Sequence, residues 1–165
     1  MPISMVRIDD RLIHGQVVFA WTKMLNATVI VVPDDSAAAD PMQKTMMKAA
    51  TPIGVRSAIV SIADGAALLT GPKLTKEKVL VVVRGPASAV GLINAGVEIK
   101  KITIGNMRGE SGKKRVSKEV AVNEEEWNSF KELDSKGIDL IIQWLPGGDS
   151  KNLNEVLKKQ DFISL

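Results

Sequence analysis

Short runs of β-branched and aliphatic residues alternate along the chain with longer amphipathic stretches, and this alternation constrains the fold more than any other feature. The apolar runs predict strands at residues 4–8, 28–32, 55–62, 79–84, 101–104 and 138–144. The amphipathic stretches predict helices at residues 15–25, 40–50, 64–69, 87–95, 124–135 and 152–159. This order predicts an α/β fold with an open, mostly parallel central sheet, because parallel neighbours need a crossover and a helix is the usual one.

Local signals refine this prediction. The run at 79–83 is apolar throughout, so we expect helices on both faces of the sheet. Residues 116–122 predict a short, antiparallel edge strand, and Asp40 and Pro41 predict a helix start as N-cap and first-turn proline. Residues 36–40 and 106–115 have the composition of exposed loops. The chain of 165 residues has the length of one domain, and we expect a single domain over 1–165.

Composition excludes several classes of site. With no Cys and one His, the chain cannot form disulfides, thiol nucleophiles or metal sites that need more than one Cys or His ligand. Because there is no Tyr, and three Phe and three Trp are scattered, no stacking platform for nucleic acid is expected. The phosphate-binding and dinucleotide glycine motifs are absent, so we expect no nucleotide cofactor and no metal.

Targeting signals are also absent from the expected places. The N-terminal residues include Arg7 and lack a long apolar region, which argues against a secretory signal. The longest apolar runs are far shorter than the roughly 20 residues that span a bilayer. We therefore expect the protein in the cytoplasm.

The most informative segment is RIDDRLIHGQV at residues 7–17, where the first predicted strand passes into the first predicted helix. The carboxyl end of a strand is where open α/β sheets bind ligands, and the chain's one imidazole, His14, lies there. Gly15 allows backbone N–H groups to approach a ligand closely. The segment also holds four charged side chains that can neutralise an anion or orient an imidazole, namely Arg7, Asp9, Asp10 and Arg11. Together they predict a site that holds a phosphoryl group.

Each feature also has a simpler interpretation. A single His in a loop is most often a solvated or hydrogen-bonded structural residue, and the arginines can merely pair with the neighbouring aspartates. The group Met42, Met46 and Met47 is expected to fill the core, although Met-rich faces also bind partners. The basic run 113–115 is interpreted as a solvated loop or a docking surface for a partner.

The segment RIDDRLIHGQV resembles the active-site segment of the IIB component of the mannose/fructose/sorbose family of the bacterial sugar phosphotransferase system. Three further stretches resemble that family: PDDSAAADPMQKTMMKAATP at 33–52, VEIKKITIGNMRGESGKKRVSKEVAV at 97–122 and ELDSKGIDLIIQWLP at 132–146. The resemblance covers roughly residues 3–160. Asn106, in the second loop, resembles the N-acetylgalactosamine branch more than the mannose or sorbose branches.

The resemblance implies a phosphocarrier with transferase activity. It would take a phosphoryl group from a phosphohistidine on a IIA partner, hold it on Nδ1 (the pros nitrogen) of His14, and pass it to a sugar bound by membrane IIC and IID subunits. This function places the protein at the inner face of the membrane through its partners. The sequence leaves the sugar and the oligomeric state open.

Roles can be assigned to the residues around this histidine. We expect Arg11 and Arg7 to contact the phosphoryl oxygens, because a guanidinium binds them bidentately. Asp9 or Asp10 is expected to fix the imidazole tautomer. Backbone N–H groups near the start of the following helix and residues of the second loop complete the expected phosphoryl or partner contacts: Ile13, Gly15, Gln16, Asn106 and Arg108. The alternative is a non-enzymatic α/β module whose His14 hydrogen-bonds an anionic metabolite.

Overall fold

The computed structural model describes residues 2–165 and contains a sheet of seven strands. They are β1 (Ile3–Asp9), β2 (Val29–Pro33), β3 (Arg56–Val60), β4 (Val79–Val83), β5 (Lys101–Asn106), β8 (Asp139–Gln143) and β9 (Ser150–Asn152). Their order is β3-β2-β4-β1-β5-β8-β9, and every neighbouring pair is parallel except β8 and β9. Two shorter strands, β6 (Lys114–Arg115) and β7 (Ala121–Val122), form a separate antiparallel pair.

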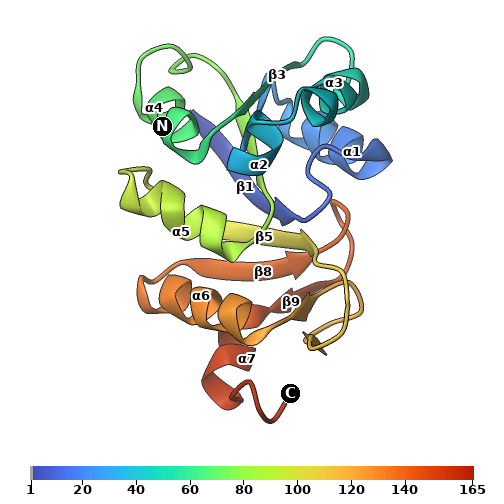
Figure 1. The fold of residues 1–165 in the computed structure, drawn as a ribbon, viewed down its shortest axis with the longest axis vertical. Helices are drawn as coiled ribbons and strands as arrows, with labels where there is room; N and C mark the ends of the chain where they lie inside the picture. The colour runs from blue at the N-terminus through green and yellow to red at the C-terminus, as the bar shows by residue number, and fades with distance from the viewer. Residues whose placement is uncertain (1) are drawn as a thin grey trace.

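Helices cover both faces of the sheet (Figure 1). They are α1 (Gly15–Leu25), α2 (Asp35–Ala38), α3 (Pro41–Ala50), α4 (Ile62–Thr70), α5 (Pro86–Asn94), α6 (Glu124–Ser135) and α7 (Leu153–Lys159). Alternate side chains of the fully buried strand β4 belong to two different clusters, because successive strand residues point to opposite faces. One cluster joins the sheet to α4, α5, α6 and α7, and the other joins it to α1, α2 and α3. The predicted open, mostly parallel sheet with helices on both faces is confirmed.

Helix starts follow local capping chemistry. Asp40 accepts hydrogen bonds from the backbone N–H groups of Met42 and Gln43, and Pro41 occupies the first turn of α3, as the sequence predicts. Asn123 and Glu126 form a reciprocal capping box at the start of α6. The predicted bounds of α1 and α6 agree with the observed ones.

The prediction of a strand over residues 116–122 is wrong. Only Ala121 and Val122 are in a strand, β7, which pairs with β6 rather than with the main sheet. Val116 and Val120 are buried in the larger core cluster from a turn, closed by a hydrogen bond from Val116 N–H to the Val120 carbonyl. The short edge strand of the main sheet is instead β9, whose sequence Ser-Lys-Asn is exposed and carries no apolar pattern.

The prediction that residues 36–40 form an exposed loop is also wrong in part. Asp35–Ala38 forms the short helix α2, with Ala37 fully buried. Asp34 caps this helix by accepting a hydrogen bond from the Ala37 N–H. A helix of four residues is too short to show a periodic apolar pattern.

Within residues 2–165, none of the helices combines the length and the apolar character that a membrane crossing requires.

Candidate functional site

The strand register brings three connecting segments to one edge of the sheet. Ile8 in β1 lies beside Val83 in β4 and Ile104 in β5, and Asp9 lies beside Asn106. The residues that follow these three strands therefore meet at their carboxyl ends. The helix after β1 packs on one face and the helix after β4 on the other, which makes this edge a switch point of the kind where α/β sheets bind ligands.

His14 is presented outward at this edge. It is the N-cap residue of α1, its backbone is extended, and its side chain is exposed. The imidazole does not cap the helix, and none of the hydrogen bonds among residues 2–165 involves it. Both ring nitrogens are therefore open to a reaction partner.

The loop before His14 is anchored by apolar side chains. Leu12 and Ile13 are 2% and 4% exposed and belong to the cluster under α1 and α3. Leu12 has φ 61° and Gly15 has φ 54°, so two left-handed residues bracket the histidine. A left-handed leucine is uncommon and is tolerated where packing holds it, as the burial of its side chain does here. Gln16, in the first turn of α1, is exposed.

Asp9 holds Arg11 rather than the imidazole. The Arg11 Nε and Nη2 donate to Asp9 Oδ1 and Oδ2, both at 3.1 Å, and Asp9 is 2% exposed. The Arg11 guanidinium also lies 5.1 Å from the centre of the Trp144 ring. Arg11 and His14 line the same cavity, of about 290 Å³. Arg11, whose guanidinium is fixed by Asp9, therefore lines the cavity beside the exposed imidazole.

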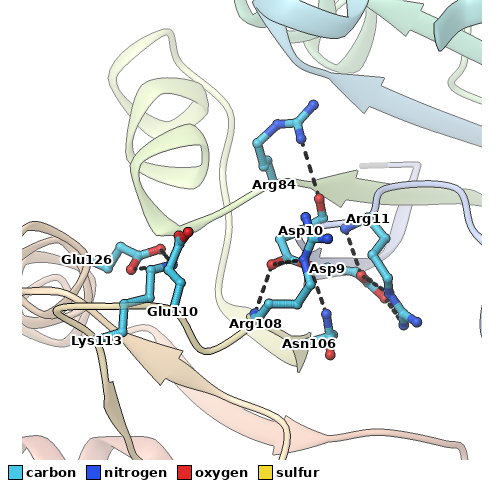
Figure 2. A network of polar contacts seen from close by, with 9 residues as sticks. All are labelled: Asp9, Asp10, Arg11, Arg84, Asn106, Arg108, Glu110, Lys113 and Glu126. Atoms are coloured by element: carbon cyan, nitrogen blue, oxygen red, sulfur yellow. Dashed lines mark hydrogen bonds and ion pairs between the residues drawn. The ribbon is translucent and has the colours of Figure 1, made fainter.

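Asp10 connects two of the three segments (Figure 2). Its Oδ1 accepts from Asn106 Nδ2 at 2.7 Å, and its Oδ2 accepts from the Arg108 backbone N–H at 2.8 Å and from Arg108 Nε at 3.3 Å. Asn106 is nearly buried, whereas the Arg108 side chain is exposed. The structure therefore gives both Asp9 and Asp10 partners other than the imidazole.

Arg7 is buried, which corrects the expectation that it contacts a phosphoryl group. Its Nη1 donates to the Gln143 carbonyl at 2.9 Å and its Nη2 to the Trp144 carbonyl at 2.7 Å. The guanidinium stacks on Trp21 at 4.7 Å and fills the space where a Cβ on Gly105 would lie. Burial lowers the pKa of Arg7 to about 10, so it stays cationic at pH 7. Its function is to hold the end of β8 against α1.

Arg84 lies at the candidate site, and the sequence analysis missed it. It directly follows β4, and it lines the same cavity as His14 and Arg11. Its Nε and Nη2 donate to Asp34 at 3.1 and 3.0 Å. Its Nη1 lies 3.4 Å from the main-chain oxygen of Asp10, a contact that Figure 2 shows. No local motif marks Arg84, because its importance depends on β4 being the neighbour of β1.

The basic run 113–115 is largely engaged within the fold. Lys113 is 12% exposed and pairs with Glu110 and Glu126. Lys114 donates to the carbonyls of Phe162 and Ile163 near the end of the chain. These contacts correct the interpretation of the whole run as a solvated or docking surface.

The prediction that Met42, Met46 and Met47 fill the core is wrong for two of the three. Met47 is 6% exposed, but Met42 and Met46 are 72% and 64% exposed. Met46 lines the His14 cavity together with Gln43. The turn of α3 that faces this cavity therefore presents a flexible apolar side chain beside the charged groups.

Within residues 2–165, no group of three or more His, Cys, Asp or Glu side chains is gathered in a way that could hold a metal ion. The groups at this edge that can bind an anion are the imidazole, the guanidinium groups and the first backbone N–H groups of α1.

Known proteins resemble the chain over nearly its whole length. The PTS system fructose-specific EIIB component of Bacillus subtilis is 34% identical over 96% of this chain and 97% of its own. The PTS system mannose-specific EIIAB component of Escherichia coli K12 is 34% identical over 98% of this chain, which spans half of that protein's length. The crystal structure of the IIBSor domain of the sorbose permease from Klebsiella pneumoniae superposes with a TM-score of 0.92 at 31% identity, covering 98% of this chain and 99% of that one.

These three proteins are named for three different sugars, so the likeness does not select one of them. The family model of the PTS system sorbose subfamily IIB component matches residues 3–164. Because both the sequence and the fold match over almost every residue, the chain belongs to the sorbose subfamily of phosphotransferase-system IIB components.

Proposed function

We propose that the chain, as a single IIB domain, is a phosphoryl carrier and sugar phosphotransferase subunit. It accepts a phosphoryl group on Nδ1 of His14 from a phosphohistidine of a IIA partner, and it donates the group to a sugar that enters through membrane IIC and IID subunits. The observation that carries this proposal is the exposed imidazole of His14, which has no hydrogen-bonding partner within residues 2–165. The imidazole therefore does not have the hydrogen-bonded structural role that a loop histidine often has, and it is accessible to a phosphoryl donor.

The transfer needs no other reactant. In the first step the lone pair of His14 Nδ1 attacks phosphorus, the P–N bond to the donor breaks, and the donor imidazole keeps the electron pair. In the second step a sugar hydroxyl oxygen attacks phosphorus, the P–N bond to His14 breaks, and the hydroxyl proton passes to a base or to water. Both steps require in-line approach from outside, which the exposed rim of the sheet allows.

Arg11 is the residue to which we assign charge stabilisation. Arg11 lines the same cavity as His14, and Asp9 fixes its guanidinium through Nε and Nη2, which leaves Nη1 without a protein partner within residues 2–165. A guanidinium in this position can bind equatorial phosphoryl oxygens in the transition state. Asp10 acts as a positioning residue, because its carboxylate sets the loop of Asn106 and Arg108 against the His14 loop.

The N-terminus of α1 supports the same anion. The first N–H groups of a helix have no intrahelical acceptors and carry a partial positive charge. In α1 these belong to the residues from Gly15 and Gln16 onward, directly after the histidine. We therefore assign Gly15 and Gln16 to phosphoryl contact through their backbones, and Ile13 to anchoring the loop.

The proposal is tested by incubating the purified protein with phosphoenolpyruvate and the upstream phosphotransferase proteins, including a IIA partner. We expect the intact mass to increase by one phosphoryl group, in an acid-labile and alkali-stable linkage. In the variant His14→Ala we expect no increase and an unchanged circular dichroism spectrum, because an exposed loop residue adds little to the core. A wild-type protein that stays unmodified would instead support a non-enzymatic module that binds an anionic metabolite. We place the active protein at the inner face of the membrane, through its membrane partners.

A further inference from the structure

We propose that Arg84 is a second phosphoryl-binding guanidinium, which acts with Arg11 as a two-sided clamp on the group carried by His14. The inference rests on the proposed phosphocarrier function and adds a catalytic residue to it. Arg84 lies outside every segment whose sequence suggests the site.

The two arginines are held in the same way. Arg11 donates through Nε and Nη2 to the two oxygens of Asp9, and Arg84 donates through Nε and Nη2 to the two oxygens of Asp34. Both carboxylates are almost buried, at 2% and 5% exposed. Each ion pair therefore fixes the plane of a guanidinium and turns its Nη1 edge away from the carboxylate.

Both arginines line the cavity beside the imidazole. Arg11, Arg84 and His14 line one cavity of about 290 Å³ at the carboxyl edge of the sheet. The strand register explains why, since Arg84 follows Val83, which lies beside Ile8 in β1. Within residues 2–165, the Nη1 of Arg84 makes one hydrogen bond, at 3.4 Å to the Asp10 carbonyl. This distance is long for a hydrogen bond, so the contact is readily exchanged for a stronger acceptor.

The guanidinium of Arg84 stays protonated. Its hydrogen bonds to Asp34 raise its pKa above the ordinary arginine value, so it remains cationic at any pH at which the protein functions. A phosphoryl group in transfer carries negative charge on three equatorial oxygens. Two guanidinium groups and the first N–H groups of α1 supply donors for all three.

The test is a single-turnover measurement of phosphoryl acceptance from a phosphorylated IIA partner. Removing one charge-assisted hydrogen bond costs about a 10- to 100-fold factor in rate. We expect a loss of this size for Arg84→Gln and a smaller loss for Arg84→Lys, which keeps the charge without the planar fork. The matched control is Arg56→Gln, since Arg56 also pairs with a carboxylate, Glu77, but does so at the start of β3. Its rate should equal that of wild type.

A second variant distinguishes loss of the guanidinium from loss of the fold as the cause of a slower rate. Arg84→Gln leaves the nearly buried Asp34 without its cation, whereas Asp34→Asn/Arg84→Gln removes both charges and keeps an acceptor for the Ala37 N–H. We expect the double variant to be folded and as slow as Arg84→Gln. If the folded double variant accepts phosphoryl within about twofold of the wild-type rate, the assignment of Arg84 is wrong.

A binding measurement separates this inference from the phosphocarrier function. His14 is the only histidine, so its ring proton resonances report inorganic phosphate binding without ambiguity. At fixed pH we expect phosphate to shift these resonances in the wild-type protein, with about tenfold weaker binding in Arg84→Gln and no change in Arg56→Gln. Equal affinity in wild type and Arg84→Gln, or no shift in wild type, would contradict the clamp. Failure of the wild-type protein to become phosphorylated would instead contradict the proposed function.

Discussion

The two arginines of the segment at 7–17 differ in burial and therefore in the groups that they contact. Arg7 points into the molecule and binds main-chain carbonyls, whereas Arg11, four residues later, is held at the surface by Asp9. The sequence identified both as candidates for an anion site but could not separate them. Strand alternation alone places Arg7 and Asp9 on the same side of β1, and only the packing of Trp21 and Gly105 shows that Arg7 is enclosed.

We expect Arg7→Lys to lower the free energy of unfolding. A lysine ammonium cannot donate along the two directions that Arg7 uses to reach the Gln143 and Trp144 carbonyls. A buried carbonyl without its donor costs about 1–3 kcal/mol. Urea unfolding followed by tryptophan fluorescence measures the change, and a midpoint equal to that of wild type would show that Arg7 does not hold the end of β8.

We expect Arg11→Lys to lower the rate of phosphoryl transfer and to leave the free energy of unfolding nearly unchanged. A lysine keeps a cation beside Asp9, so we expect a free energy of unfolding close to that of wild type, but it loses the planar guanidinium fork of a residue that lines the cavity. Single-turnover transfer from phosphorylated IIA should slow by about tenfold. An unchanged transfer rate would remove Arg11 from the mechanism.

At the scale of secondary-structure elements, the sequence predicted those elements that carry a strong apolar period. The amphipathic period sets α1 and α6, and continuous apolar runs set β2 and β4. The elements it missed, α2, β6 and β9, are two to four residues long and have no such period. The apolar side chains of residues 116–122 reach the core from a turn. Their spacing resembles the period of two residues that a strand shows, so the sequence pattern alone does not distinguish the turn from a strand.

The stabilisation that Asp40 gives to the start of α3 should decrease at low pH. Hydrogen bonds from the Gln43 side chain and then its backbone hold the pKa of Asp40 below its usual value. The ionised carboxylate therefore stabilises the folded state fully above the unfolded pKa of about 3.9, and this stabilisation is lost as pH falls through the lower folded value. Asp40→Asn keeps a capping oxygen that does not titrate.

We therefore expect the difference in unfolding free energy between wild type and Asp40→Asn to stay constant between pH 7 and about pH 5, and to shift in favour of the variant below about pH 4. Urea unfolding of both proteins across this range measures it. A difference that is the same at every pH would show that the hydrogen bonds to Asp40 do not depend on its ionisation.

At the scale of the whole molecule, the site is assembled by strand order, which the sequence does not encode locally. The segment at 7–17 is recognisable by itself, but Arg84 and Asn106 reach it because β4 and β5 flank β1. Contacts with distant parts of the chain likewise make some basic residues of the second loop partly buried and leave others exposed. Lys113 and Lys114 are tied to α6 and to the chain's last residues, while Arg115 and Lys118 are exposed.

These exposed residues lie beside the candidate site. Arg115 and Lys118 line an open groove of about 650 Å³ together with Asn106 and Trp144. Asn106 is hydrogen-bonded to Asp10, so the groove borders the His14 loop. A phosphorylated partner carries a dianion, which positive charge at this rim attracts during encounter.

We expect Arg115→Gln/Lys118→Gln to lower the association rate with phosphorylated IIA by a few-fold at low salt and to make that rate less dependent on salt. The reason is that electrostatic steering weakens as the Debye length falls from about 10 Å at 0.1 M salt to about 3 Å at 1 M salt. The control is Lys113→Gln/Lys114→Gln, which removes the same charge from residues already engaged within the fold. It should lower the unfolding midpoint and change association much less. Stopped-flow transfer at several salt concentrations compares the two. If both double variants show the same salt dependence, net charge rather than the position of Arg115 and Lys118 governs encounter.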